Sequence, residues 1–289
     1  MRARRFAVIG DPVGHSKSPA MHGAAFHALG LPHTYEAVRV SSAELAHIVG
    51  ELRKGRFDGL NVTVPHKQRV LPLVDVLDDT TRLAGAANTL VRRDDGTIVA
   101  HNTDVPALAG ELQRISRSGL REVDRPWAPV RALVLGSGGA ARAAVVALSA
   151  RLGVRDIAVR ARSFTDSTRR DAFLATAPCP VTAQPWAPSE DSERATEVLV
   201  QATSAGMRGG EPGEAVAEAV AWDKVPAGAV ALDVVYSPRD TPWLRAARDR
   251  GLRCDDGLGM LARQGALAFE LWLGIDAPID VMRAALDKP

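Results

Sequence analysis

The sequence predicts an α/β protein of two domains, each built on an open, mostly parallel sheet. Short apolar runs rich in β-branched residues alternate with helical patterns, which is typical of parallel strands joined by helices. At 289 residues with 46% hydrophobic residues, the chain is long enough to bury two cores. Residues 116–130 are polar and interrupted by prolines, which indicates a linker or a surface excursion between domains.

The composition excludes several classes of function. A balance of 36 basic against 34 acidic residues gives no basic footprint for nucleic acid. The two cysteines lie far apart, which excludes a disulfide framework or a cysteine-based zinc site, and the histidines form no metal-binding pattern. The apolar run after the basic start is too short for a signal peptide, and no run reaches membrane-spanning length. We therefore expect a cytoplasmic protein without a metal or a membrane partner.

The first part of the chain predicts two strands, each followed by a helix. These elements cover residues 6–10, 20–29, 33–40 and 42–53. Ser18 suits the N-cap of the first helix, with Pro19 in the first helical position. Because a helix N-terminus favours anions, the hydroxyls of Ser16 and Ser18 could hold a carboxylate. A capping serine with a solvated neighbour is the alternative interpretation.

Residues 59–64 are an apolar run that predicts a buried strand, ended by a proline that has no N–H for the ladder. Thr63 and Lys67 lie where it ends, at the sheet edge where open α/β sheets bind ligands. A hydroxyl and an ammonium there suit a polar substrate, although a solvated lysine starting a helix is the alternative. Residues 68–83 have a helical pattern with a break expected at Pro72.

Residues 86–91 and 98–100 predict a hairpin, because the Asp-Gly pair between them tolerates the positive φ of a tight turn. Asn88 lies at the start of the first arm. Asp104 follows the second arm and leads into a helix over residues 107–115, where a carboxylate also suits the helix dipole.

The middle of the chain carries a dinucleotide-binding pattern. A buried strand over residues 132–135 runs into Gly136-Ser137-Gly138-Gly139-Ala140-Ala141, which opens an alanine-rich helix that ends at Gly153. The spacing fits G-x-G-x-x-G/A, in which glycines permit a tight turn and the close approach of a pyrophosphate. The next strand, residues 156–159, ends in Arg160-Ala161-Arg162-Ser163. An arginine there favours the 2′-phosphate of NADP over NAD, so we expect an NADP-binding Rossmann domain.

The rest of the chain continues the alternation. Strands are expected over residues 198–201 and 230–235, and helices over residues 169–176, 241–250, 260–273 and 279–286. Thr241 suits the N-cap of its helix, with Pro242 in the first helical position. Gln264 is a central amide on an apolar helix. Residues 255–259 indicate a turn, and residues 178–188 have no clear assignment.

Together these motifs resemble the shikimate dehydrogenases, from about residue 10 to residue 274. The shared motifs are GDPVGHSKSP (10–19), NVTVPHK (61–67), GAANT (85–89), NTD (102–104), the glycine-rich turn (136–140) and DGLGMLARQGA (256–266). The resemblance implies a substrate-binding domain of residues 1–105 plus 258–289 and a Rossmann domain of residues 106–257. It also implies reduction of 3-dehydroshikimate to shikimate with NADPH, on the route to chorismate and the aromatic amino acids.

The resemblance further implies the roles of individual residues. Lys67 would be the catalytic acid/base, with Asp104 beside it. The implied substrate contacts are Ser16, Ser18, Thr63, Lys67, Asn88, Asp104, Tyr236 and Gln264. The implied cofactor contacts are Gly136, Ser137, Gly138, Gly139, Ala140, Arg162, Val234, Gly257 and Asp79. The partner is then a small-molecule substrate, and the enzyme is a monomer or a homodimer.

The chain departs from the family pattern at a few positions, among them Gly23, Val105 and Gln201. Ala161 stands where the family often has asparagine, which weakens the expected grip on a 2′-phosphate. An NAD-dependent quinate/shikimate dehydrogenase therefore stays open as an alternative. A non-catalytic, ligand-sensing regulator on the same scaffold is the second alternative, but its expected signature, loss of Lys67 or Asp104, is not seen.

Overall fold

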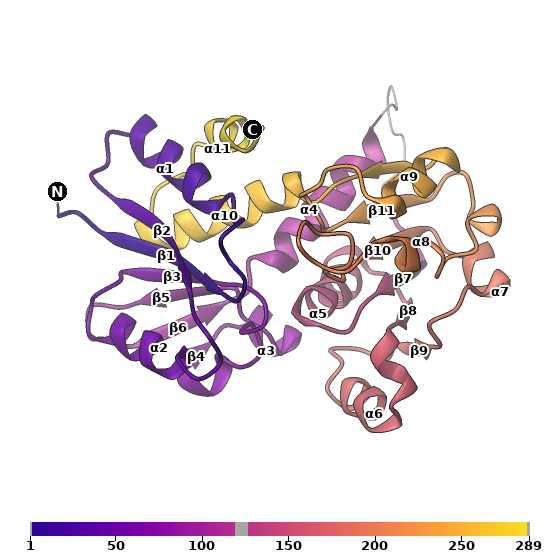
Figure 1. Cartoon of the computed structure of the whole chain (residues 1–289), viewed down its shortest axis with the longest axis horizontal. Helices are drawn as coiled ribbons and strands as arrows, with labels where there is room; N and C mark the ends of the chain where they lie inside the picture. The colour runs from indigo at the N-terminus through magenta and orange to yellow at the C-terminus, as the bar shows by residue number, and fades with distance from the viewer. Residues whose placement is uncertain (1, 119–126, 288–289) are drawn as a thin grey trace. The chain divides into compact units, whose positions relative to one another are not determined.

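The computed structural model describes residues 2–118 and 127–287 and divides the chain into two compact units (Figure 1). The terminal unit comprises residues 1–104 and 261–289, and the central unit comprises residues 105–260. The domain limits expected from the sequence, after residues 105 and 257, lie close to these boundaries. Most of the expected linker, residues 119–126, lies outside the described residues.

The terminal unit contains a mixed six-stranded sheet. Its order is β2 (Thr34–Arg39), β1 (Arg5–Gly10), β3 (Gly59–Val62), β5 (Thr89–Arg92), β6 (Ile98–His101) and β4 (Val76–Leu77). Strand β1 runs parallel to β2 and β3, whereas β5 is antiparallel to β3 and β6. The hairpin is therefore confirmed, and its turn uses Gly96 at φ +86°. Two of the five strand pairings are antiparallel, so this sheet is less parallel than expected.

Helices cover both faces of this sheet (Figure 1). They are α1 (Ser18–Ala28), α2 (Leu45–Arg53), α3 (Asp79–Ala84), α10 (Leu258–Leu273) and α11 (Ile279–Leu286). On one face, Leu52 of α2 packs with apolar side chains of β1, β3 and β5. On the other, Phe6 stacks on Trp272 with ring centroids 4.7 Å apart. The Trp272 Nε1–H donates to the Leu90 carbonyl at 3.0 Å, which ties α10 to the sheet.

Two expectations for this unit are wrong. The helical pattern of residues 68–83 is interrupted further than by the expected break at Pro72, because a 3₁₀ turn at Leu71–Leu73 and the short β4 precede α3. The side chain of Asp78 caps α3 by accepting from the Thr81 N–H at 2.6 Å, which sets a new helix start. Ser18 is not an N-cap but the first residue of α1, after Lys17. Its N–H donates to the Ser16 hydroxyl oxygen at 3.2 Å, so Ser16 takes over part of the capping role.

The central unit contains a parallel six-stranded sheet. Its order is β12 (Arg253–Asp255), β11 (Val230–Asp233), β10 (Val198–Gln201), β7 (Arg131–Leu135), β8 (Asp156–Arg160) and β9 (Thr182–Gln184). Numbered from β7, this is the strand order 3-2-1-4-5-6 of a Rossmann sheet read in reverse, and every pairing is parallel. The sheet therefore has its topological switch point between β7 and β10, where ligands of open α/β sheets bind.

The helices of the central unit follow the strands in alternation. They are α4 (Asp104–Arg117), α5 (Gly139–Val146), α6 (Ser167–Ala175), α7 (Glu190–Arg194), α8 (Glu214–Ala217) and α9 (Pro242–Asp249). The expected cap of α9 is confirmed, because the Thr241 hydroxyl accepts from the Leu244 N–H at 3.1 Å. Three details differ from expectation: α5 continues as a π-helical turn at Ala147–Arg151, β9 lies within the unassigned residues 178–188, and the turn expected over residues 255–259 is shortened to residues 256–257 between β12 and α10.

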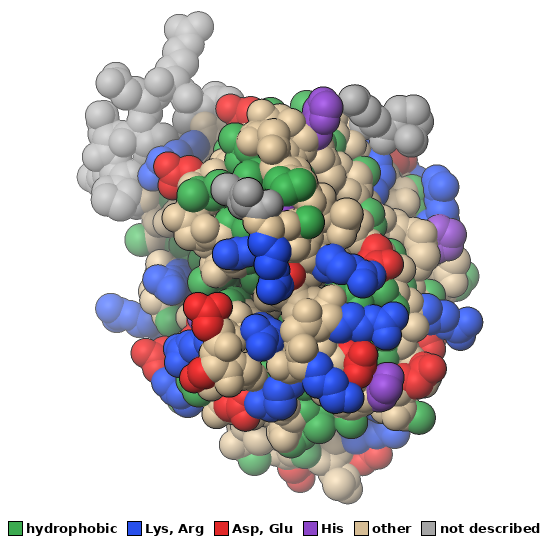
Figure 2. Space-filling model, turned by 90° about the vertical axis from the view of Figure 1, so that its left-hand side faces the viewer, with side chains coloured by type: hydrophobic (Ala, Val, Ile, Leu, Met, Phe, Trp, Pro, Cys, Tyr) green, Lys and Arg blue, Asp and Glu red, His purple; other side chains and the backbone are tan. Residues whose placement is uncertain are grey.

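Charged side chains of both signs are interspersed on the molecular face drawn in Figure 2. Exposed ion pairs such as Arg5–Glu36, at 3.1 Å, and Arg53–Asp75, at 2.6 Å, are part of the terminal unit. Among the described residues, no helix combines the length and the apolar character needed to span a membrane. These same residues hold no cluster of three or more metal-ligating side chains.

Candidate active site

Lys67 and Asp104 form an ion pair in the terminal unit. Lys67 follows β3, and its Nζ lies 2.6 Å from Oδ2 of Asp104, the residue that begins α4. Only 16% of the lysine side chain and 6% of the aspartate side chain are exposed. The N–H of Ala87 donates to the Lys67 carbonyl at 2.8 Å, which holds the loop after β3 against the start of the hairpin. The two residues are 37 positions apart in the sequence, and the fold brings them into direct contact.

Asn88 links this ion pair to α10. Its Nδ2 donates to Asp104 Oδ1 at 2.8 Å and to the Thr103 hydroxyl at 2.9 Å, and it lies 3.3 Å from Gln264 Oε1. Four of the expected substrate contacts thus form one cluster of an ammonium, a carboxylate and two amides. Such a cluster can bind neighbouring hydroxyl groups through charge-assisted hydrogen bonds and can supply a proton from its lysine.

The remaining expected substrate contacts of the terminal unit lie after the ends of β1 and β3, which are adjacent and parallel. Ser16 and buried Ser18 lie where the loop after β1 meets α1. Thr63 follows β3, and its N–H donates to the Ile9 carbonyl at 2.9 Å. Gly10 permits this approach, since a Cβ there would lie 2.9 Å from the Val64 carbonyl oxygen. Tyr236, by contrast, belongs to the central unit.

The glycine-rich turn of the central unit fits a dinucleotide. Gly136 has φ +121°, and a Cβ there would lie 2.9 Å from the Ala202 carbonyl oxygen at the switch point. Gly138 is the N-cap of α5, and the space that its Cβ would occupy is open. The first-turn N–H groups, among them those of Gly139 and Ala140, can therefore be approached closely by a pyrophosphate. The hydroxyl of Ser137 lies 2.9 Å from that of Ser163, at the end of the next strand.

The two arginines after β8 have different environments. Arg160 is fully buried and pairs with Glu193 at 2.8 Å, so its charge is neutralised inside the unit. Arg162 has 54% of its side chain exposed and pairs with Glu211 at 2.5 Å. Its guanidinium lies 6.0 Å from the centre of the Trp186 ring. Arg162 is therefore the cation of this strand end that a 2′-phosphate can reach.

Val234 and Gly257 lie side by side in the central unit. The N–H of Gly257 donates to the Val235 carbonyl at 3.1 Å, and a Cβ on Gly257 would overlap the Val234 carbonyl. Asp233, just before Val234, is fully buried, and burial raises the pKa of its carboxyl from 3.8 to about 7. Its carboxyl accepts from the Val235 N–H at 2.9 Å and from the Thr241 hydroxyl at 2.6 Å.

Asp79, the last of the expected cofactor contacts, stands apart from the others. It belongs to the terminal unit, begins α3, pairs with Arg82, and has 92% of its side chain exposed. All other expected cofactor contacts belong to the central unit.

Two buried polar residues close to these expected contacts were not identified from the sequence. Asp233 ends an apolar strand, and Asn61 stands inside one. An isolated polar residue within a buried strand is a signal for such positions, because burial requires a hydrogen-bonding partner.

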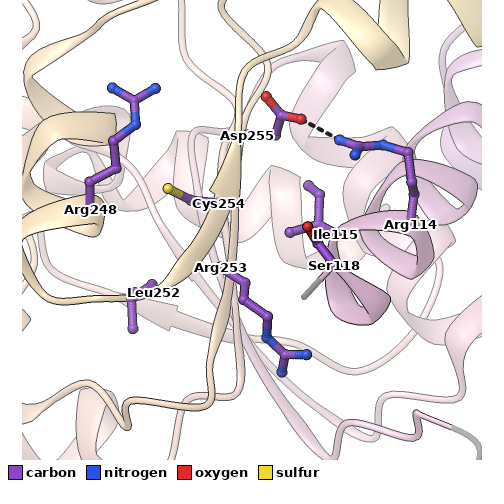
Figure 3. Close-up of a pocket in the computed structure, with 8 residues that line it drawn as sticks. All are labelled: Arg114, Ile115, Ser118, Arg248, Leu252, Arg253, Cys254 and Asp255. Carbon is purple, nitrogen blue, oxygen red and sulfur yellow. Dashed lines mark hydrogen bonds and ion pairs between the residues drawn. The ribbon is translucent and has the colours of Figure 1, made fainter. Parts of the chain in front are cut away.

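A cavity of about 250 Å³ in the central unit contains none of the expected site residues (Figure 3). Arg114, which lines it, forms ion pairs with Asp255, as the dashed line in Figure 3 shows, and with Glu111 at 2.6 Å. Its charge is thereby balanced, and burial raises the pKa of the neighbouring Cys254 thiol. The residues that line this cavity are therefore different from those that form the polar clusters described above.

Comparison with known proteins places the chain in a family. A model of the shikimate dehydrogenase substrate binding domain matches residues 8–90, and one of the shikimate 5′-dehydrogenase C-terminal domain matches residues 257–286. The shikimate dehydrogenase (NADP(+)) of Microcystis aeruginosa is 37% identical over 294 residues, covering 99% of this chain and 97% of that protein.

The chain is also similar to solved structures over nearly its whole length. Shikimate 5-dehydrogenase of Thermus thermophilus, in complex with NADP(H) and shikimate, superposes with a TM-score of 0.79 at 33% identity, covering 98% of each chain. The 5-ketofructose reductase of Gluconobacter superposes with a TM-score of 0.80 at 28% identity, covering 99% of each chain. Since this fold also carries a reductase of another substrate, the assignment of function depends on the site residues as well as on the fold.

Proposed function

Because the chain belongs to the shikimate dehydrogenase family, we propose that it reduces 3-dehydroshikimate reversibly to shikimate with NADPH. The observation that carries this proposal is the Lys67–Asp104 pair, joined to Asn88 and Gln264 in the terminal unit. A regulator without turnover would not need an ammonium held at 2.6 Å from a carboxylate next to polar substrate contacts.

Lys67 and Asp104 would perform the proton transfer. Bound NADPH supplies the hydride, and negative charge then develops on the carbonyl oxygen of the substrate. The Lys67 ammonium stabilises this oxygen and donates a proton to it. Asp104 fixes the direction of the lysine Nζ through their ion pair at 2.6 Å. In the oxidation direction, the neutral amine of Lys67 takes the proton back from the hydroxyl.

The substrate would be held at its carboxylate and at its hydroxyl groups. We assign the carboxylate to the hydroxyls of Ser16 and Ser18 beside the N-terminus of α1, and we propose Tyr236 as another substrate contact. The ring hydroxyls would contact Thr63 and the cluster of Asn88, Asp104 and Gln264. The amides and the carboxylate together offer both donors and acceptors, as hydroxyl groups require.

The cofactor would be held by the central unit. The turn from Gly136 to Ala140 would bind the pyrophosphate through backbone N–H groups, and Arg162 would bind the 2′-phosphate. Val234, Gly257 and Asp79 are proposed as additional contacts.

The second candidate is an NAD-dependent quinate/shikimate dehydrogenase. Two residues favour it. Ala161 supplies no polar group to bind a 2′-phosphate, and Glu211 already forms an ion pair with the Arg162 guanidinium. Steady-state assays with shikimate and quinate, each with NADP⁺ and NAD⁺, separate the two candidates. We expect shikimate with NADP⁺ to give the highest kcat/KM. A higher value for quinate with NAD⁺ would favour the second candidate, and no turnover in any combination would contradict both.

We further propose that the enzyme works in the cytoplasm as a monomer or a homodimer, with a small-molecule substrate and no nucleic-acid partner. The balanced formal charge of +2 supports the absence of a nucleic-acid partner.

A further inference from the structure

A chain of hydrogen bonds, buried in its middle and partly buried at both ends, leads from Tyr35 on β2 to the Lys67–Asp104 pair. The Tyr35 hydroxyl donates to Oδ1 of Asn61 at 2.7 Å, reaching across β1 to β3. The Asn61 side chain is buried, so its amide is held with Nδ2 pointing away from the tyrosine. That Nδ2 donates to the Asn88 carbonyl at 3.1 Å and to the Thr89 hydroxyl oxygen at 3.0 Å.

The next step of the chain fixes the Asn88 side chain. The Thr89 hydroxyl oxygen accepts from Asn61, and the hydroxyl donates to Oδ1 of Asn88, 3.2 Å away, with the Thr103 hydroxyl oxygen as its more distant neighbour at 3.4 Å. The Thr103 N–H donates to the same Oδ1 at 2.8 Å. With Oδ1 occupied by donors, Nδ2 of Asn88 must face Oδ1 of Asp104, at 2.8 Å. Oδ2 of Asp104 is then presented to Lys67.

The alternative orientation of the Asn88 amide is unfavourable for the catalytic pair. A rotated amide would place its carbonyl oxygen against the Asp104 carboxylate, so that two acceptors would oppose each other. Asp104 would then turn away, and the Lys67 ammonium would lose its orientation. A displacement of about 1 Å in a reacting group is enough to reduce turnover strongly.

We propose that Tyr35, Asn61 and Thr89 are positioning residues, whose hydrogen bonds hold Asn88 in the orientation that presents Asp104 to Lys67. Only the effects that this inference predicts on kcat and KM rest on the proposed function. The Tyr35 ring is held independently, because it stacks on His22 with ring centroids 4.3 Å apart and planes at 8°. Replacement by phenylalanine therefore removes the hydroxyl and leaves the packing.

The test uses Tyr35→Phe, Thr89→Val and the double variant in the full chain. Each single variant is expected to lower kcat for shikimate oxidation by about fivefold, with KM changed less than about twofold. The two changes break one chain, so the double variant should lose no more activity than the more affected single variant. Thr89→Ser restores the hydroxyl and should restore kcat.

Thr81→Val is the matched control, because Thr81 is a buried threonine of the same unit whose hydroxyl donates to the Ala100 carbonyl at 3.2 Å. It should lower the melting temperature as Thr89→Val does while leaving kcat unchanged. Equal loss of kcat in Thr81→Val, or additive losses in the double variant, would overturn the proposal.

A readout without turnover separates this inference from the proposed function. Hydrogen exchange of the Asn88 side-chain amide, followed by NMR, should become several-fold faster in Tyr35→Phe and Thr89→Val and stay unchanged in Thr81→Val. Unchanged exchange in all three variants would overturn the positioning role, whatever the substrate of the enzyme is. Absence of shikimate turnover in the unmodified enzyme would contradict the proposed function alone.

Discussion

At the scale of single residues, the site depends on how charges are compensated. Lys67 and Asp104 are largely withdrawn from water and stabilise each other, whereas Arg162 is half exposed and pairs with an equally exposed Glu211. An exposed pair is weak, because water and salt screen it, and a phosphate can displace its carboxylate. The first pair therefore suits proton transfer, and the second suits a cofactor that binds and leaves.

Replacement of Arg162 tests the second pair. In Arg162→Ala, the Kd for NADP⁺ should rise by at least about tenfold, because a charge-assisted bond to the 2′-phosphate is lost. The Kd for NAD⁺, which lacks this phosphate, should change little. Glu211→Gln is the companion variant and should tighten NADP⁺ binding by roughly two- to fivefold by removing the competing carboxylate. Calorimetry measures both, and equal effects on NADP⁺ and NAD⁺ would contradict the assignment.

The serine pair makes a different prediction. Replacing both Ser16 and Ser18 by alanine should raise the KM for shikimate by about tenfold or more while kcat falls little, because the carboxylate lies away from the reacting carbon. Ser42→Ala, in a serine before α2, serves as the control. An unchanged KM in the double variant would remove the carboxylate from this site.

At the scale of elements, local signals predicted what depends on local chemistry. The hairpin of β5 and β6 follows from its Asp-Gly turn, and the start of α9 follows from Thr241 and Pro242. The helical pattern expected over residues 68–83, with a break at Pro72, is wrong for most of its length because the apolar spacing arises from separate contacts. Val70 is buried in the core, whereas the two residues of β4 pair with β6. Pairing with a distant strand is not visible in a local pattern.

The same limit applies to the site. Lys67, Asp104 and Asn88 lie in motifs that the sequence displays, so their grouping at one site could be predicted, and the structure brings the three into contact. The contact between Tyr35 and Asn61 requires the strand order β2-β1-β3, which cannot be derived from local sequence patterns. The burial of Asp233 likewise depends on the residues that pack around β11.

Asp233 closes the loop between β11 and α9 and predicts a dependence of stability on pH. Since its pKa is raised to about 7 by burial, the folded protein binds this proton more tightly than the unfolded chain. The favourable contribution of the Asp233 carboxyl to the free energy of unfolding is complete below about pH 4 and is lost as the pH rises through about 7. Asp233→Asn keeps a hydrogen-bonding side chain without the charge. The unfolding free energy of this variant should therefore not decrease in this way as the pH rises.

Urea unfolding at two pH values checks this prediction. Between about pH 5 and pH 8, the wild-type protein should lose roughly 2 kcal/mol relative to Asp233→Asn. Asp249→Asn, on the exposed side of α9, is the matched control. A constant difference between wild type and Asp233→Asn at both pH values would show that Asp233 does not titrate in this range.

At the scale of the whole molecule, the two units have different sheets and different expected ligands. The terminal unit holds the cluster of Lys67, Asp104, Asn88 and Gln264 on a mixed sheet, and the central unit holds the glycine-rich turn on a parallel Rossmann sheet. Tyr236, an expected substrate contact, belongs to the central unit, and Asp79, an expected cofactor contact, belongs to the terminal unit. Because the two groups of residues are carried by separate cores, a change in one should leave binding by the other intact.

The most direct test of the central claim, that Lys67 transfers the proton, is kcat for NADP⁺ reduction by shikimate in Lys67→Ala, measured together with the Kd values of shikimate and NADP⁺. We predict that kcat falls by at least about a hundredfold, while NADP⁺ binding is unchanged and shikimate still binds. Turnover near the wild-type rate would contradict the account.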